Sequence, residues 1–166
     1  MMQDRFINIK GVKTRYWDEG HGEHTIVLVH GVAACAEYWE KNFSVLSGYA
    51  RVIALDLIGF GQTDKPNIAY THELFARFLK DFLDAINIKK CILVGHSMGG
   101  GVSLAFTLDY PQYVEQLVLV SSAGFDRQLP LTFRLVGQPI LGKLLVQTHS
   151  RKALSIALRR FAYRKE

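Results

Sequence analysis

Residues 91–105 read CILVGHSMGGGVSLA: an apolar run, a serine set between glycines, and then a run of small residues. This order predicts a strand, a sharp turn that carries Ser97, and a helix. Such a turn strains the backbone of its serine, which gives a steric reason for small residues at positions 95 and 99. A G-x-S-x-G pentapeptide also occurs by chance in glycine-containing loops, so the interpretation depends on what accompanies it.

Two upstream segments also place a loop directly after an apolar run. Residues 25–29 read TIVLV and are followed by HGV at 30–32, and VIAL at 52–55 is followed by DLIGFGQTD at 56–64. Both apolar runs have the β-branched character of strands. The chain therefore carries three motifs in sequence order, each at the carboxyl end of an expected strand.

In this order and spacing the chain resembles the α/β-hydrolase superfamily, with its HG oxyanion loop, D-x-x-G-x-G-x-[ST] loop and nucleophile elbow. The resemblance covers nearly the whole chain, although its motifs say little about a substrate. It implies an α/β fold with a mostly parallel sheet and an antiparallel N-terminal hairpin, of which the last two strands are lacking. It also implies a core of six strands at residues 1–125 and the beginning of a helical cap or lid at 126–166.

Local patterns predict several element boundaries. The strands expected at 6–9 and 13–17 flank KGV at 10–12, which predicts a hairpin turn. Thr71 is the expected N-cap of a helix with a broad apolar face. The helix after Ser97 is expected to end before Pro111.

The composition indicates a globular chain without a targeting segment. Its 166 residues are 49% hydrophobic, residues 1–10 are polar and charged, and no stretch is long and apolar enough for a membrane span. A cytoplasmic location follows as an expectation. Cys35 and Cys91 are isolated in the sequence, so reduced, buried thiols are expected rather than a disulfide framework or a zinc site.

The positive charge of the chain belongs to its C-terminal segment. Of 20 Lys and Arg residues against 15 Asp and Glu, residues 126–166 hold 9 against 2, which leaves 11 against 13 for the rest. A solvated helix face is the ordinary interpretation. No RNA-binding aromatic motif accompanies it, so no nucleic-acid partner is expected. Stable membrane association is not expected either, although a lipid-surface role for this segment is a second rival hypothesis. The sequence does not indicate an oligomeric state.

The resemblance implies the roles of three residues. Ser97 is the expected nucleophile, and the backbone N–H groups of Val32 and Met98 form the expected oxyanion hole, where two donors must stabilise one developing negative charge. Since backbone groups do this work, the side chains at positions 32 and 98 can vary.

Three further residues are expected to support the pocket or its loops. His30 and Gly31 lie in the oxyanion motif, where a structural histidine that orders the loop is favoured over a general base. His96 precedes the nucleophile and is expected to pack or to line the pocket. None of the three is assigned a proton-transfer role.

The base that should activate Ser97 is not evident in the sequence. Superfamily members order their residues as serine, acid and histidine. After the sixth expected strand, at 117–120, the acids are Asp126 and Glu166 and the histidine is His149. We therefore expect the acid and histidine beyond residue 166, on the order of 100 further residues, and expect these 166 residues alone to be inactive. In the competing hypothesis, Asp126 and His149 complete the triad.

No cofactor or metal is predicted. GFG at 59–61 lacks the third glycine of a dinucleotide loop, and GGG at 99–101 lacks the lysine of a phosphate-binding loop. His72 has no second histidine four residues later, as a zinc helix would require. Asp56 is interpreted as a structural residue of its turn, together with Thr63.

The sequence thus predicts a cofactor-independent serine hydrolase that acts on an ester or a similarly activated carbonyl of a small molecule. A serine at position 97 argues against the dehalogenase and epoxide-hydrolase branches, which use aspartate there. Esterases, lipases and carbon–carbon bond hydrolases remain open. The alternative is a ligand-binding protein that keeps the elbow without a working base.

Overall fold

The computed structural model describes residues 2–123. The expected cap at residues 126–166, with Asp126 and His149, lies outside the described residues. The division of the chain at residue 125 therefore stays a prediction.

Within residues 2–123 three strands come first, and helices and strands then alternate. In chain order these are β1 (Arg5–Ile9), β2 (Val12–Glu19), β3 (Thr25–Val29), the 3-10 helix η1 (Ala36–Trp39), α1 (Glu40–Leu46), β4 (Arg51–Leu55), α2 (His72–Ala85), β5 (Cys91–His96), α3 (Met98–Asp109), the 3-10 helix η2 (Pro111–Tyr113) and β6 (Val114–Val120).

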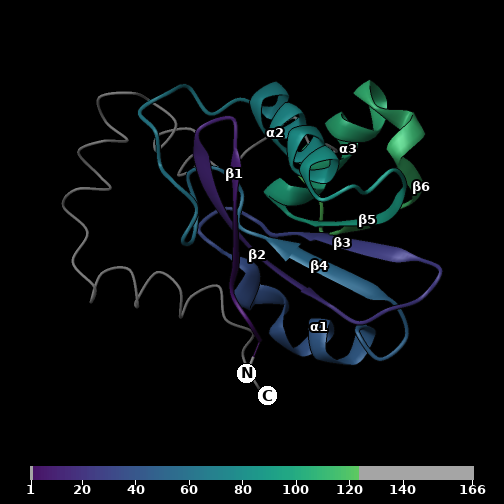
Figure 1. The fold of residues 1–166 in the computed structure, drawn as a ribbon. Coiled ribbons are helices and arrows are strands. Elements are labelled where there is room, and N and C mark those ends of the chain that lie inside the picture. Colours follow the sequence, from purple (N-terminus) through teal and green to yellow (C-terminus); the bar gives the residue numbers. More distant parts are fainter. Residues whose placement is uncertain (1, 124–166) are drawn as a thin grey trace, which may run out of the picture. The chain divides into compact units, whose positions relative to one another are not determined.

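The six described strands form one mixed sheet in the order β1-β2-β4-β3-β5-β6. β2 pairs antiparallel with both β1 and β4, whereas β3 pairs parallel with β4 and β5, and β5 pairs parallel with β6. Figure 1 shows α2 and α3 on one face of this sheet and α1 on the other. The predicted fold class, a mostly parallel sheet with an antiparallel N-terminal hairpin, is confirmed.

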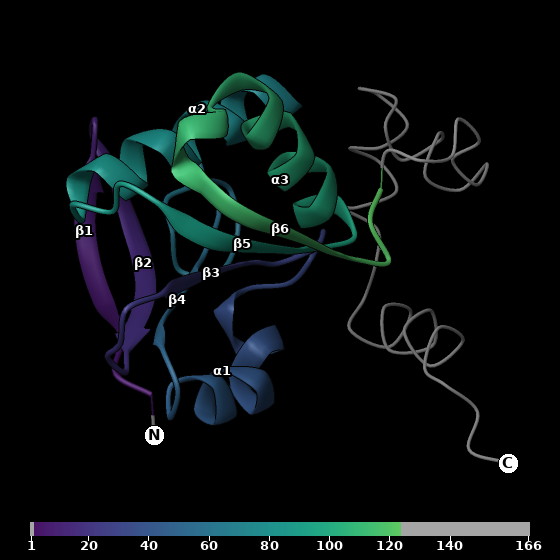
Figure 2. The ribbon, with the colours of Figure 1, turned by 90° about the vertical axis from the view of Figure 1, so that its right-hand side faces the viewer.

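Two apolar cores cover the two faces of the sheet. The larger core packs α2 and α3 onto the strands and includes the fully buried Phe82, Leu93 and Phe106. The smaller one packs Phe43 of α1 and Trp39 of η1 onto the opposite face. Figure 2 shows the resulting three layers edge-on. Burial of this apolar surface holds the parallel strands together, so their carboxyl ends stay aligned.

The predicted local signals agree with the structure where they can be compared. Lys10 and Gly11 both have positive φ, at 49° and 91°, as a tight turn between right-twisted strands requires. The Thr71 hydroxyl accepts the Leu74 N–H at 3.2 Å and caps α2. α3 ends at Asp109, before Pro111 as expected.

β2 and β6 extend by more than one residue beyond their expected ranges. β2 continues to Glu19 because Asp18 and Glu19 pair with Ile53 and Val52 of β4. β6 begins at Val114 rather than at residue 117. Its early residues include exposed polar side chains, which interrupt the apolar run that predicted the strand.

Both cysteines are free: Cys91 is buried in β5 as expected, but Cys35 is only partly buried. Residues 2–123 contain no helix with the length and apolar character needed to cross a membrane.

Candidate active site

Ser97 joins β5 to α3 in a strained backbone conformation, with φ 52° and ψ −119°. Hydrogen bonds hold this conformation on both sides of the residue. Its N–H donates to the Val120 carbonyl at 3.1 Å, and its own carbonyl accepts from the N–H groups of Gly100, Gly101 and Ala123 at 3.0, 3.2 and 2.9 Å. The positive φ of a serine marks a position that the surrounding structure determines, as is common at functional sites.

The glycines around Ser97 are sterically required, as the sequence predicted. A Cβ atom placed on Gly95 would lie 2.5 Å from both the Gly99 carbonyl oxygen and Ser103 Oγ. A Cβ atom on Gly99 would lie 2.3 Å from the His30 carbonyl oxygen. The sharp turn and the close approach of α3 to β3 therefore both exclude a side chain.

Residues 30–36, the oxyanion loop, lie directly beside the elbow. β3 and β5 are parallel neighbours with Val29 opposite Gly95, so the residues that follow them meet at one edge of the sheet. A Cβ atom on Gly31 would lie 3.1 Å from Ser97 Cβ and 3.0 Å from His96 Nδ1. The first and third of the three sequence motifs, HGV and the elbow, are therefore in contact through Gly31.

The two amides assigned to the oxyanion hole come from this edge. Val32 follows Gly31 and is half exposed, at 49%, and Met98 is the first residue of α3. N–H groups in the first turn of a helix have no partner within the helix and carry its positive dipole end. Among residues 2–123, neither amide donates a hydrogen bond. Within the described residues, both N–H groups are therefore free to donate to a ligand.

His30 is fully buried and uses both ring nitrogens. Nε2 accepts the Leu57 N–H at 3.1 Å, so the proton must lie on Nδ1, which is 2.8 Å from the Gly31 carbonyl oxygen. Burial lowers the pKa of His30, which favours this neutral form. With both nitrogens engaged, the ring is placed to order the loop rather than to take a proton from Ser97.

His96 packs against η1. Its ring stacks on Tyr38 with centroids 4.6 Å apart and planes 21° apart. Nδ1 has no hydrogen-bond partner among the described residues, and burial lowers the pKa of the ring. Tyr38 is half exposed. His96 thus packs beside the elbow, and within residues 2–123 it forms no hydrogen bond or ion pair with a carboxylate.

Asp56 holds its turn together, as the sequence predicted. Its carboxylate accepts the N–H groups of Ala36 and Gln62 at 2.7 and 2.8 Å, and its carbonyl accepts the Thr63 hydroxyl at 2.8 Å. Asp56 is fully buried. These contacts connect the turn after β4 to the end of the oxyanion loop.

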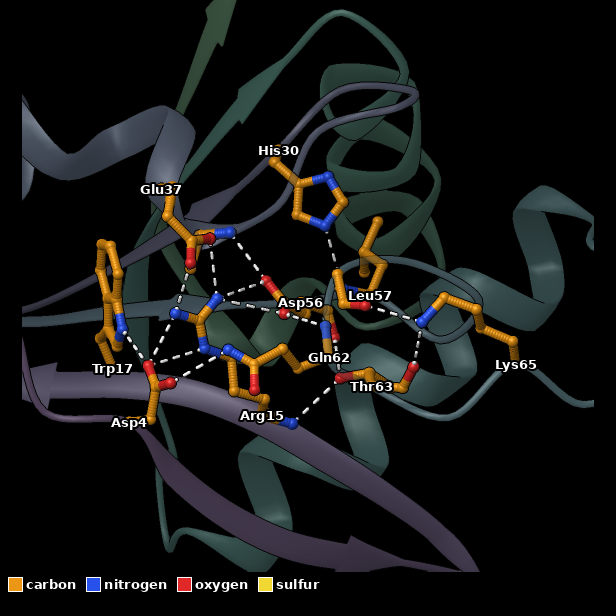
Figure 3. Close-up of polar contacts among 12 residues, drawn as sticks. Asp4, Arg15, Trp17, His30, Glu37, Asp56, Leu57, Gln62, Thr63 and Lys65 are labelled. Atoms are coloured by element: carbon orange, nitrogen blue, oxygen red, sulfur yellow. Dashed lines mark hydrogen bonds and ion pairs between the residues drawn. The ribbon is translucent and has the colours of Figure 1, made fainter. Parts of the chain in front are cut away.

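The sequence interpretation missed Arg15, which completes this network. Its side chain is 2% exposed and pairs with Asp4, Glu37 and Asp56 (Figure 3). Cys35, Glu37 and Asp56 also present possible metal-ligand atoms within 4.8 Å of one another. Arg15 already gives both of these carboxylates a cationic partner within residues 2–123.

The described part of the chain shows no general base paired with Ser97. Within residues 2–123, Ser97 Oγ makes no hydrogen bond to a histidine, and His30 and His96 are engaged as described. Asp126 and His149 lie outside the described residues.

Comparison with known proteins identifies the family. Residues 24–146 match the family described as alpha/beta hydrolase fold. The chain is 42% identical over 125 residues to a 2-hydroxy-6-oxo-6-(2'-aminophenyl)hexa-2,4-dienoic acid hydrolase of Metapseudomonas resinovorans, which covers 73% of this chain and 43% of that protein. It is 39% identical over 130 residues to a 2-hydroxy-6-oxo-2,4-heptadienoate hydrolase of Pseudomonas putida, and the alignment covers 75% of this chain and 46% of that protein.

Solved structures with a similar fold support the same family. A meta-cleavage product hydrolase from Pseudomonas fluorescens IP01 superposes with a TM-score of 0.70 at 35% identity, covering 74% of this chain and 46% of that one. Cfl2 from Burkholderia cenocepacia gives a TM-score of 0.87 at 27% identity, covering 95% and 58%. The chain spans less than half the length of the two curated relatives. With its motifs, sheet order and relatives in agreement, this chain belongs to the alpha/beta hydrolase family.

Proposed function

We propose that the protein is a serine hydrolase that cleaves an ester or a similarly activated carbonyl, with Ser97 as its nucleophile. The observation that carries this proposal is the positive φ of Ser97, 52°, at a turn that touches the oxyanion loop through Gly31. A strained backbone persists only where its surroundings hold it. Here the Ser97 backbone is held by hydrogen bonds with β6, α3 and Ala123.

In the proposed reaction, Ser97 Oγ attacks the carbonyl carbon while a base takes the hydroxyl proton. The carbonyl oxygen gains negative charge, which the N–H groups of Val32 and Met98 stabilise. The leaving group departs with a proton, and water then releases the acyl group from Ser97 by the same steps. We expect the acid and histidine of this mechanism to lie beyond residue 166.

The relatives suggest the first substrates to test. Two of them are named as hydrolases of 2-hydroxy-6-oxo dienoic acids, and these names specify a ketone at carbon 6. A carbonyl activated by conjugation of this kind, and simple p-nitrophenyl esters, both fall within the proposed class.

A fluorophosphonate probe tests the proposal, because it reacts rapidly with a serine that a base activates and scarcely with an ordinary hydroxyl. We expect the protein, at the length its native source makes it, to be labelled at Ser97, and the label to disappear in Ser97→Ala. Ser44→Ala is a suitable control, since Ser44 is an exposed serine that donates to the Lys41 carbonyl. The 166-residue chain alone is expected to react only slowly.

The opposite result has a clear meaning. If the folded native-length protein leaves Ser97 unlabelled, the serine lacks a working base, and the alternative of a ligand-binding protein without catalysis replaces the proposal. Intact mass from the native source tests whether a base lies beyond residue 166: about 30 kDa is expected if two further βα units and the rest of a cap follow, whereas 18.8 kDa would favour a ligand-binding protein or a defunct enzyme.

A further inference from the structure

The oxyanion loop is held at both ends by residues that follow β4. At its start, His30 Nε2 accepts the Leu57 N–H at 3.1 Å. At its end, the Ala36 N–H donates to Asp56 Oδ1 at 2.7 Å. Within residues 2–123 the Gly31 carbonyl also accepts from His30 Nδ1 and Ala34 N at 2.8 and 3.3 Å, and the Cys35 carbonyl accepts the Tyr38 N–H at 3.0 Å. The two end contacts tie the loop that carries the Val32 amide to the turn after β4.

Arg15 organises the second of these contacts. Its Nη1 and Nη2 donate to the two carboxylate oxygens of Glu37 at 2.8 and 2.7 Å, and Nη1 lies 3.3 Å from Asp56 Oδ2. Nε and Nη2 donate to Asp4 at 2.8 and 2.6 Å. Figure 3 shows the guanidinium between these three carboxylates. One side chain thus joins the residue after Ala36 to the carboxylate that binds the Ala36 amide.

The centre of this charged network is shielded from water. The Arg15 side chain is 2% exposed and that of Asp56 is fully buried, whereas Glu37 is half exposed. The hydrogen bonds from Arg15 lower the pKa of Glu37 to about 2, so this pair stays ionised through the neutral range. Bidentate arginine–carboxylate pairs fix geometry as well as contributing energy.

We propose that Arg15 is a positioning residue for the oxyanion hole: through Glu37 and Asp56 it fixes the end of the loop that presents the Val32 amide. The inference rests on the proposed function, since it gives Arg15 a part in that reaction without any contact with substrate. An oxyanion donor acts mainly in the transition state, so its displacement lowers kcat more than it changes KM.

A matched control lies on β2, which carries Arg15, and on β4, which leads into Asp56. Arg51 of β4 donates from Nε and Nη2 to the two carboxylate oxygens of Asp18 on β2, at 2.9 and 2.7 Å. This pair is also bidentate, but it lies at the amino end of β4, away from the loop. Arg51→Lys therefore matches Arg15→Lys, and Asp18→Asn matches Glu37→Gln.

Amide hydrogen exchange of the 166-residue chain tests the contact itself, without any need for activity. In Arg15→Lys and Glu37→Gln we expect the Ala36 amide to exchange about tenfold faster, the scale of one weakened charge-assisted hydrogen bond, while Ile53 in β4 is unchanged. Arg51→Lys and Asp18→Asn should leave Ala36 unaffected. Glu37→Gln keeps the test decisive if Arg15→Lys fails to fold, because Glu37 is half exposed. Unchanged Ala36 exchange, or equal acceleration at Ala36 and Ile53, overturns the inference.

Ester hydrolysis by the native-length protein tests the catalytic part. We expect Glu37→Gln to lower kcat about tenfold with KM within about twofold of wild type, and Asp18→Asn to retain kcat. Faster Ala36 exchange with an unchanged kcat overturns the positioning role. If wild-type Ser97 is not labelled by fluorophosphonate, the proposed function fails and the catalytic part fails with it, whereas the exchange result still decides whether Arg15 holds the loop.

Discussion

Replacement of Gly99 by alanine is expected to push the first turn of α3 away from the end of β3. An alanine Cβ there would lie 2.3 Å from the His30 carbonyl oxygen and 2.4 Å from that of Val29. Ordinary contact begins at 3.4 Å, so helix and strand must separate by the difference between 3.4 and 2.3 Å, which is 1.1 Å. Both opposing atoms belong to the backbone, so no side-chain rotation relieves the overlap.

Gly101 is the matched control for this change. A Cβ atom on Gly101 meets its nearest neighbour, the Ala123 carbonyl oxygen, at 3.4 Å, which is ordinary contact. Alanine favours the helix over glycine by about 0.5–1 kcal/mol at either position, so this gain cancels between the two variants. The remaining difference is the cost of overpacking, about 1–3 kcal/mol, with Gly99→Ala the less stable variant.

Urea unfolding of wild type, Gly99→Ala and Gly101→Ala measures this difference. We expect the midpoint of Gly99→Ala to fall below wild type and that of Gly101→Ala to equal or exceed it. In thermal unfolding the two variants should differ in Tm by about 2–12 °C for a chain of this size. If Gly99→Ala is as stable as Gly101→Ala, the close approach of α3 to β3 is wrong, and the contact between elbow and oxyanion loop is wrong with it.

Two further changes test the core and the buried histidine. Phe82→Ala removes a fully buried ring that packs edge-on against Tyr16, with ring centroids 5.3 Å apart. We expect the free energy of unfolding to fall by about 3–5 kcal/mol, whereas Tyr49→Ala, at an 84% exposed position, should cost about 0.5 kcal/mol or less. A loss below about 1 kcal/mol for Phe82→Ala would contradict this packing. Burial lowers the pKa of His30 below its ordinary 6.5, so the unfolded chain binds the proton more readily: the stability that His30 contributes is complete above pH 6.5 and is lost as the pH falls toward its folded pKa. Urea midpoints from about pH 8 to about pH 5 should therefore fall less steeply in His30→Asn than in wild type, and equal slopes would contradict the neutral form assigned to His30.

Signals carried by neighbouring residues predicted much of the fold. The turn at Lys10 and Gly11, the Thr71 cap and the end of α3 before Pro111 each depend on backbone chemistry within a few residues, and all three agree with the structure. The strand boundaries were less accurate. β6 begins with Glu115 and Gln116 among its first residues, and polar side chains on an exposed strand leave no apolar periodicity to identify them.

The Arg15 network could not be predicted because its members are distant in sequence. Asp4, Glu37 and Asp56 lie 11, 22 and 41 residues from Arg15. In an alternating strand, an arginine is ordinarily interpreted as facing solvent. The one signal that pointed to this region was the turn motif after β4, which identified Asp56 as structural without its partner.

The conformation of Ser97 has a consequence for the order in which the chain is made. Its N–H donates to the Val120 carbonyl, and its own carbonyl accepts the Ala123 N–H, so two of the residues that maintain the elbow follow it by more than twenty positions. A ribosome that has just released the GHSMG segment has not yet made these partners. During synthesis, the hydrogen bonds between Ser97 and the residues at positions 120 and 123 can therefore form only after the sixth strand has emerged.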